Sequence, residues 1–466
     1  MMERASWCVI RAVFAAAVVA VGCGSAWAGE PVAVPAPEIK VTVDPWCQLL
    51  PVGKEAKVSV LVNSAGKPAQ AGLVEVKLTL DGGSVSFGTF TNDLAKANPF
   101  TFTRTLDRSG FLYGQLAIVG GNEKDRRNRK DFSVAFDPWG IREGAPEPKD
   151  FDAFWRQALE RQAAVKDPVK LTPISKPEWD PRFDYYDVEI KTASPAGRNY
   201  GVMGVPKGKK GPFSALVICQ AWGGGYGCPE PNYVRDDLIT LALSCHAQDP
   251  CDPKWWSETY PHLQKDVWPH GSYILQGLEK RETFYFYNSI LGAVQAVDYL
   301  RARPDFNGDL YYEGGSQGGT FGLYLGGLRP GAFKAIAVQN PGFCDFCGAD
   351  QGRRSTAGEP YTHWKRIHPE ESDATMRERL GVFDACYFAK RITDPILFLV
   401  SYRDDCCYAS TVYAAYNNVP RSTVKFIVNG RDRSHSWSWE HMNDAWQWLQ
   451  NFMPPAPRAY RKYWAW

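Results

Sequence analysis

Long apolar runs are scarce in this 466-residue chain, and neither sign of charge is in excess. No segment beyond the N-terminal stretch reaches the roughly 18 consecutive apolar residues that a membrane-spanning helix needs. The chain has 53 Lys and Arg and 51 Asp and Glu, which gives a formal net charge of +2. Its one dense basic run, residues 124–130, is typical of a solvated loop. Nucleic-acid binders usually carry a concentrated basic patch. We therefore expect no membrane span and no nucleic-acid partner.

Metal-binding patterns are equally scarce. The chain has seven histidines, and no two of them have the spacing of a zinc peptidase. Cys344 and Cys347 form one Cys-x-x-Cys pair, but no second pair follows at the spacing of a zinc finger. We interpret these cysteines as structural or disulfide-forming, and we expect no metal and no organic cofactor.

The N-terminus has the pattern of a secretory signal peptide. Arg4 and Arg11 precede an apolar run over residues 12–21, and Ala26-Trp27-Ala28 offers a cleavage site between small residues. We predict a signal peptide over residues 1–28 and a secreted or periplasmic protein, with lipid attachment at Cys23 as the alternative. In an oxidising compartment, some of the ten cysteines beyond residue 28 should pair. A bond between the adjacent Cys406 and Cys407 would be strained, so we expect different partners or free thiols there.

The first third of the chain alternates apolar and polar residues with period two. Residues 29–36 are rich in Pro, Ala and Val and are typical of a linker. Strand patterns then follow, separated by turn residues, at 39–43, 56–62, 74–80, 100–103, 111–119 and 132–136. This spacing predicts an immunoglobulin-like β-sandwich within residues 29–137. No catalytic pattern falls inside it, so a spacer or packing module is favoured over carbohydrate binding.

Strands and helices alternate in the remainder. Residues 138–148, with three prolines and two glycines, predict a second linker that a protease could cut, leaving a fragment from Pro148 that folds alone. A helix follows, with Asp150 as its expected cap. Continuous apolar runs at 215–219 and 238–243 are typical of strands buried on both faces. Residues 149–466 therefore predict an α/β domain with a mostly parallel sheet.

One motif points to chemistry. Gly314-Gly315-Ser316-Gln317-Gly318 fits Gly-x-Ser-x-Gly, after a strand at 310–313 and before a helix at 320–328. In that context the sharp turn lifts the serine hydroxyl above the sheet, where it acts as a nucleophile. A Gly-rich turn without such a role is the alternative.

A serine nucleophile needs a base, and the base needs an acid to orient it. In this fold the order is Ser, acid, His. Asp404 follows the strand at 396–400 and is our candidate acid, with its neighbour Asp405 as the alternative. His435 follows the last strand and is our candidate base. His441 is the competitor, but it lies inside the final helix. The other histidines are interpreted as surface or structural residues.

The oxyanion of an acyl transfer needs two backbone N–H donors. We expect one from Gln317, directly after the nucleophile. The second should come from the loop Gln220-Ala221-Trp222-Gly223-Gly224-Gly225, and we select Trp222. A merely flexible turn is the alternative for this loop.

Residues 145–455 resemble the acetyl xylan esterase and cephalosporin-C deacetylase family of α/β-hydrolases. The similarity lies in Asp150 to Trp155, in the elbow Gly314 to Gly319, in Pro341 to Phe346, and in the stretch from Phe383 through Asp404 to Asn417. The family's catalytic aspartate falls on Asp404. The chain departs from the family at Gln220-Ala221-Trp222, at His246-Ala247-Gln248 and after His435, where Ser436-Trp437 stands. Because of these departures, the sequence does not decide whether the chain shares the family's acetyl specificity and its hexameric assembly.

The resemblance implies a serine esterase that removes small acyl groups, above all acetyl, from carbohydrate fragments. A peptidase, or an esterase for other acyl groups, on the same fold is the first alternative. A carbohydrate-binding protein with a vestigial site is the second, and the intact Ser, Asp and His argue against it. The natural acyl group and the oligomeric state stay open.

Overall fold

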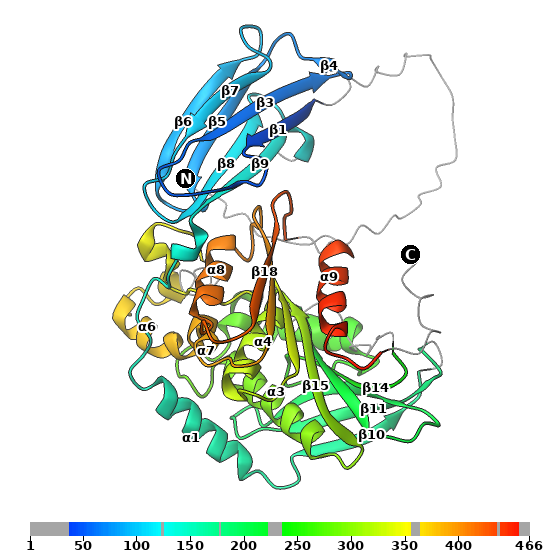
Figure 1. The fold of residues 1–466 in the computed structure, drawn as a ribbon. Coiled ribbons are helices and arrows are strands. Elements are labelled where there is room, and N and C mark those ends of the chain that lie inside the picture. Colours follow the sequence, from blue (N-terminus) through cyan, green and yellow to red (C-terminus); the bar gives the residue numbers. More distant parts are fainter. Residues whose placement is uncertain are drawn as a thin grey trace, which may run out of the picture.

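A computed structural model describes residues 37–122, 125–176, 179–221, 235–355, 364–435 and 439–455, without the side chains of residues 439–442. The predicted signal peptide, Cys23 and Trp222 lie outside the described residues. Figure 1 shows an all-β region at one end of the molecule and an α/β region below it. In the described part of the chain, no helix is long and apolar enough to cross a membrane.

The all-β region consists of two sheets that share one core. In the first sheet β3 (Ala56–Ser64) lies between β1 (Glu38–Asp44) and the strands β4 (Lys67–Pro68) and β7 (Phe100–Arg104). The second has the order β2 (Leu49–Leu50), β9 (Arg129–Phe136), β8 (Gly110–Ile118), β5 (Leu73–Leu80) and β6 (Ser86–Asp93). Alternate residues of β3 and β5, such as Val58 and Val76, are fully buried in this core. The period-two pattern thus packs the apolar face of one sheet against the apolar face of the other. The immunoglobulin-like topology stays a prediction.

A nine-stranded sheet forms the centre of the α/β region. Its order is β10 (Val169–Ile174), β11 (Phe183–Lys191), β12 (Arg198–Pro206), β14 (Leu238–Leu243), β13 (Phe213–Cys219), β15 (Phe306–Gly315), β16 (Ala335–Gln339), β17 (Ile396–Ser401) and β18 (Lys425–Gly430). The strands from β14 to β18 in this order pair in parallel, and the first three are antiparallel. This is the mostly parallel sheet that the sequence predicts, and its carboxyl ends form one edge.

Helices cover both faces of this sheet. The described helices of this region are α1 (Phe151–Ala163), α2 (Tyr260–His262), α3 (Tyr285–Ala302), α4 (Gln317–Leu328), α6 (Asp373–Leu380), α7 (Ala385–Ala389), α8 (Ala409–Asn418) and α9 (Trp439–Gln450), together with short 3-10 and π turns. The large core contains residues of α1, α3, α4, α7 and α8, whereas Ala445, Trp446 and Leu449 of α9 pack on the opposite face. Figure 1 shows α9 apart from the others, across the sheet.

Two local features differ from the expected pattern. The edge strands β6 and β10 contain no buried residue, and neither strand was predicted from the sequence. Asp150 is the N-cap residue of α1, but its carboxylate makes no capping hydrogen bond. It pairs instead with the Arg281 guanidinium, which lies far away in the sequence. A tertiary ion pair has replaced the local cap.

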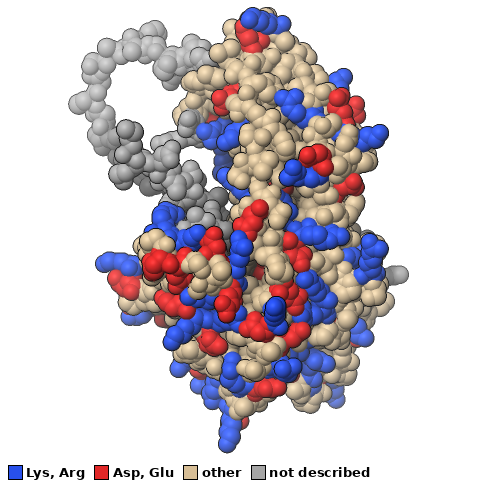
Figure 2. All heavy atoms as spheres, turned by 90° about the vertical axis from the view of Figure 1, so that its left-hand side faces the viewer, with Lys and Arg blue, Asp and Glu red and all other residues tan. Residues whose placement is uncertain are grey.

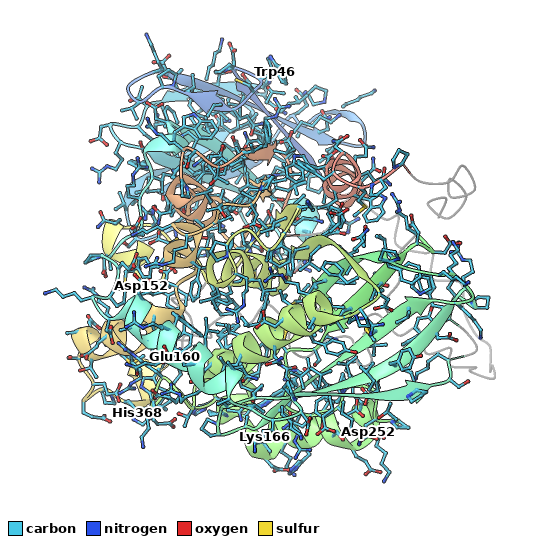
Figure 3. The ribbon with its side chains drawn as sticks, turned by 60° about the horizontal axis from the view of Figure 1, so that its bottom comes forward. Trp46, Asp152, Glu160, Lys166, Asp252 and His368 are labelled. Atoms are coloured by element: carbon cyan, nitrogen blue, oxygen red, sulfur yellow. The ribbon has the colours of Figure 1, made fainter. Side chains whose placement is uncertain are left out.

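The all-β region shares its core with the α/β region. Phe111 of β8 is 1% exposed, and its ring centroid lies 5.0 Å from that of Tyr402 and 5.7 Å from that of Tyr413. Nearby, the Arg431 guanidinium lies 4.3 Å from the ring centroid of Trp46, which Figure 3 labels at the all-β end. Aromatic pairs of this kind stabilise beyond the area they bury, so the two regions meet through packed side chains.

The segment predicted as a linker, residues 138–148, is held along its length. Asn417 donates hydrogen bonds of 2.9 Å to the carbonyls of Pro138 and Ile141. The Tyr387 hydroxyl donates to the Ala145 carbonyl over 2.9 Å, and Lys390 lies 2.8 Å from Glu143. Buried and paired backbone resists proteolysis more than an exposed loop does.

Surface charges of both signs are interspersed. On the face in Figure 2, acidic and basic side chains alternate over the α/β region, and no large patch of one sign stands out there. This distribution agrees with the formal net charge of +2.

Candidate active site

Ser316 stands at a sharp turn between β15 and α4. Its φ of 54° and ψ of −124° lie in a region that a non-glycine residue rarely adopts. The Ser316 N–H donates to the Gln339 carbonyl of β16 over 2.8 Å, which holds the turn above the sheet. Strain of this kind persists only where the surrounding structure fixes it.

The glycines around Ser316 are required by close backbone approach. A Cβ on Gly314 would lie 2.5 Å from the Gly318 carbonyl oxygen, and one on Gly318 would lie 2.4 Å from that of Cys219. Both distances are too short for any larger residue. The Gly-x-Ser-x-Gly pattern therefore follows from how tightly α4 packs against the ends of β13 and β15.

Asp404 and His435 come together at the carboxyl ends of β17 and β18. The loops after these strands are joined by backbone bonds, including one of 2.9 Å from Arg403 N–H to the Arg433 carbonyl. His435 Nδ1 lies 3.0 and 2.9 Å from the two carboxylate oxygens of Asp404. The Asp404 side chain is fully buried and that of His435 is 24% exposed. Nδ1 therefore donates to the carboxylate, and Nε2 is the nitrogen that accepts a proton when the ring is neutral.

Cys407 connects this pair with Ser316. Its backbone N–H donates to Asp404 Oδ1 over 2.7 Å, and its sulfur lies 3.8 Å from Ser316 Oγ. One ring nitrogen of His435 lies within 4.8 Å of the same sulfur. The structure thus gathers Ser316, Asp404 and His435 around one buried cysteine.

The charge of Asp404 controls the protonation of His435. Burial lowers the pKa of His435, but the hydrogen bond and the negative charge of Asp404 outweigh it and raise the pKa from 6.5 to about 9. An imidazole that is held as a strong base is suited to take a proton from a serine hydroxyl.

The two competing residues differ in their surroundings. Asp405 is exposed, next to the buried Asp404. His441 belongs to α9, but its side chain lies outside the described part of the structure.

The expected oxyanion donors are only partly described. The Gln317 N–H donates to the Ala221 carbonyl over 3.1 Å, so this donor has a protein partner in the structure. Trp222, the other expected donor, lies outside the described residues, as do the glycines that follow it.

The side chain of Gln317 is held by the core of the α/β region. The Tyr273 hydroxyl donates to Gln317 Oε1 over 2.6 Å, and Gln317 Nε2 lies 2.8 Å from the Cys245 sulfur. His246 packs beside Tyr273, stacked at 5.2 Å on Trp268. Burial lowers the pKa of His246 to about 3, so it is a neutral structural residue. These contacts fix the residue whose N–H follows the nucleophile.

The all-β region touches the loop that carries the acid. Arg403, one residue before Asp404, donates from Nη1 to the Asp131 carbonyl of β9 over 3.2 Å. Asp131 also accepts a hydrogen bond of 2.9 Å from the Tyr113 hydroxyl of β8. One side of the site is therefore built on contacts that cross between the two regions.

Sequence reasoning missed Cys407, Tyr273 and Asp131. The doublet after Asp404 was visible in the sequence, but its meaning was not, because adjacent cysteines carry no fixed geometry. Tyr273 begins a 3-10 turn of only three residues, too short to show a periodic pattern, and Asp131 lies in a strand whose pattern suggests no chemistry. No sequence signal marks either as a neighbour of the site.

Two groups of described residues bring three possible metal ligands together. One consists of Asp187, Asp249 and Cys251, but Cys251 is disulfide-bonded, so its sulfur is no thiolate donor. The other consists of Cys406, Cys407 and His435, and neither of these cysteines forms a disulfide. The Cys344 and Cys347 thiols are free and belong to neither group.

Comparison with known proteins gives one consistent result. The acetyl xylan esterase (AXE1) family matches residues 141–452. Acetyl esterase Axe7A of Xylanibacter ruminicola is 28% identical over 334 residues, which cover 70% of this chain and 71% of that protein. Solved acetyl xylan esterases from a Thermoanaerobacterium and a Paenibacillus species each have a TM-score of 0.56 and 21% identity, over 68% of this chain and 98% of theirs.

The two solved structures support the fold, and the family match supports the activity class. Residues 1–140, with the all-β region, lie outside that match. The chain belongs to the acetyl xylan esterase family and is a carboxylic ester hydrolase with an α/β-hydrolase fold.

Proposed function

We propose that this esterase removes small acyl groups, above all acetyl, from carbohydrates such as xylan fragments. Ser316 acts as the nucleophile, His435 as the base and Asp404 as the acid that orients it. The observation that carries this proposal is the buried Asp404–His435 pair of 2.9 Å beside a strained serine turn. The names of the similar proteins support acetyl esters as the substrate class.

In the proposed reaction His435 Nε2 takes the Ser316 proton as Oγ attacks the ester carbonyl. His435 then returns this proton to the leaving alcohol, and an acyl-enzyme remains. Water, activated by the same histidine, attacks the acyl carbon and releases the acid and the free serine. The buried charge of Asp404 stabilises the imidazolium in both steps.

The oxyanion would be held by the N–H groups of Gln317 and Trp222. Because the Gln317 N–H donates to the Ala221 carbonyl, that carbonyl has to turn away before the N–H serves the substrate. The loop that begins at Ala221 therefore takes part in substrate binding in this proposal. We also propose that the protein is exported, on the basis of the signal-peptide pattern in residues 1–28.

The test compares acyl length on one leaving group. A tight acyl pocket rejects each added methylene by roughly 10- to 200-fold at most. We expect aryl acetate to exceed aryl butyrate in kcat/KM by at least about ten-fold, and acetate to be released from acetylated xylan. Trp222→Ala should narrow the acetate-to-butyrate ratio if the indole limits the pocket. An unchanged ratio with a lower melting temperature would make Trp222 a packing residue, and equal rates on both esters would contradict acetyl selectivity.

A further inference from the structure

Two thiols and one imidazole lie close together at the proposed active site. The Cys406 and Cys407 sulfurs and one ring nitrogen of His435 all lie within 4.8 Å of one another. In a tetrahedral zinc site with Zn–S near 2.3 Å, two sulfurs are about 3.8 Å apart. A small inward movement of the side chains would therefore bring all three atoms to bonding distance of one ion.

Asp404 pre-arranges these ligands. Its Oδ1 accepts hydrogen bonds from the backbone N–H groups of Cys406, at 2.8 Å, and Cys407, at 2.7 Å, which fixes the turn that carries both thiols. The same carboxylate binds His435 Nδ1 and leaves Nε2 for an ion. A carboxylate that holds the far nitrogen of a ligating histidine is a common support of zinc sites.

The ligands are also accessible to a cation. Cys407 is buried, but Cys406 and His435 are partly exposed. Asp404 and the exposed Asp405 add negative charge beside them. Ser316 Oγ, 3.8 Å from the Cys407 sulfur, or a water molecule can complete a fourth position.

We infer that Cys406, Cys407 and His435 form a binding site for a soft divalent cation such as Zn²⁺, and that the bound ion inhibits the esterase. Two thiolates and a neutral imidazole are the donor set that zinc prefers. Both thiol protons leave to solvent when the ion binds. Because Asp404 holds Nδ1, an ion would bind His435 at Nε2, the nitrogen that would accept the Ser316 proton, so binding and catalysis would exclude each other. The inhibition rests on the proposed role of His435, whereas the binding does not.

Co²⁺ tests the binding without any substrate, because cobalt thiolates absorb in the near ultraviolet. The full chain is reduced, treated with a chelator and titrated with Co²⁺ alone. We expect a thiolate band that saturates at one ion per chain, and Cys406→Ser should weaken Co²⁺ binding by at least about ten-fold. Cys47→Ser is the matched control, because it removes a partly buried free thiol of the all-β region. A wild type without the band, or a Cys406→Ser variant that binds equally well, overturns the inference.

Zn²⁺ titration of aryl acetate hydrolysis tests the consequence. Wild type and Cys47→Ser should lose activity together and regain it with a chelator. Measured against its own metal-free rate, Cys406→Ser should need about ten-fold more Zn²⁺ for the same fractional loss of activity. Equal zinc sensitivity of all three proteins would overturn the inhibition and leave the esterase intact. A protein that binds Co²⁺ through thiolates but hydrolyses no ester would instead contradict the proposed function.

Discussion

The two ends of the candidate site are supported by different parts of the molecule. Ser316 and Gln317 rest on β15, α4 and the Tyr273 hydroxyl, all within the α/β region. The acid loop rests partly on the all-β region, through Arg403 on Asp131 and through Tyr402 on Phe111. Changes in the all-β region should therefore reach the acid and the base while leaving the serine turn in place.

The largest effect should come from the nucleophile end. Ser316→Ala should lower ester hydrolysis by about 10⁴-fold or more, because no other group replaces the attacking oxygen. Thermal unfolding should change little, since among the described residues the hydroxyl has only a 3.8 Å contact with the Cys407 sulfur. A purified variant that kept more than about a tenth of the activity would place the nucleophile elsewhere.

At the other end, the acid and base can be identified with matched pairs. Asp404→Asn should lower kcat by about 10⁴-fold, since a neutral amide holds the imidazole in the wrong tautomer. Asp405→Asn should stay close to wild type, because Asp405 is exposed. His435→Ala should likewise be severe and His441→Ala mild in side-by-side kinetics. If the second residue of a pair gave the larger loss of activity, the catalytic role would belong to that residue.

Packing between the two regions gives the next largest effect. Phe111→Ala removes a fully buried ring and should lower the free energy of unfolding by about 3–5 kcal/mol. Because the ring packs on Tyr402, two residues before Asp404, kcat should fall as well. Phe102→Ala is the control, since Phe102 contacts other rings of the all-β region. It should cost stability in urea denaturation and leave kcat unchanged. If Phe111→Ala kept the wild-type kcat, as Phe102→Ala should, the all-β region would contribute to stability alone.

Activity should depend on pH through His435. Because its pKa is about 9, the fraction of His435 in the neutral, proton-accepting form rises about ten-fold per pH unit up to that pH. The pH profile of kcat/KM should rise above pH 7, and the residual activity of Asp404→Asn should level off nearer the ordinary 6.5. The raised pKa also stabilises the fold fully below pH 6.5, and this contribution is lost as the pH rises through about 9. A wild-type profile that is flat from pH 6.5 upward would contradict the pairing.

The smallest effect is expected at Tyr273, whose hydroxyl holds the Gln317 side chain next to the serine turn. Tyr273→Phe deletes the hydrogen bond to Gln317, which should cost about 1 kcal/mol, or roughly five-fold in kcat, through a less fixed oxyanion donor. Tyr387→Phe deletes a similar bond, to the Ala145 carbonyl in the 138–148 segment. It should lower the melting temperature without changing kcat. If Tyr273→Phe behaved in the same way, Tyr273 would support only the fold.

Where local pattern determines structure, the sequence was sufficient. Apolar runs located the buried strands β13 and β14, and Gly-x-Ser-x-Gly located the serine turn because only small residues fit its contacts. The order Ser, acid, His led to Asp404 and His435, which the structure brings into contact. Residues 138–148 show the limit of such patterns. Proline and glycine suggest a flexible connection, but the partners on α7 and α8 are about 240 to 280 positions away in the chain.

Long-range contacts of this kind carry no local signal. The Asp150 carboxylate has the right position for a cap, and only the fold shows that Arg281 takes it. The contact of Arg403 with Asp131 joins residues 272 positions apart. A short 3-10 turn, such as the one that Tyr273 begins, has no periodicity that would place its side chains next to Gln317.

The shared core at Phe111 also bears on how such a protein arises. An all-β region joined only by a flexible segment could be exchanged between genes as a cassette. Here recombination that replaced it with an unrelated module would leave Tyr402 and Tyr413 without the ring that covers them. Substitutions at these three positions should therefore be tolerated only in combination.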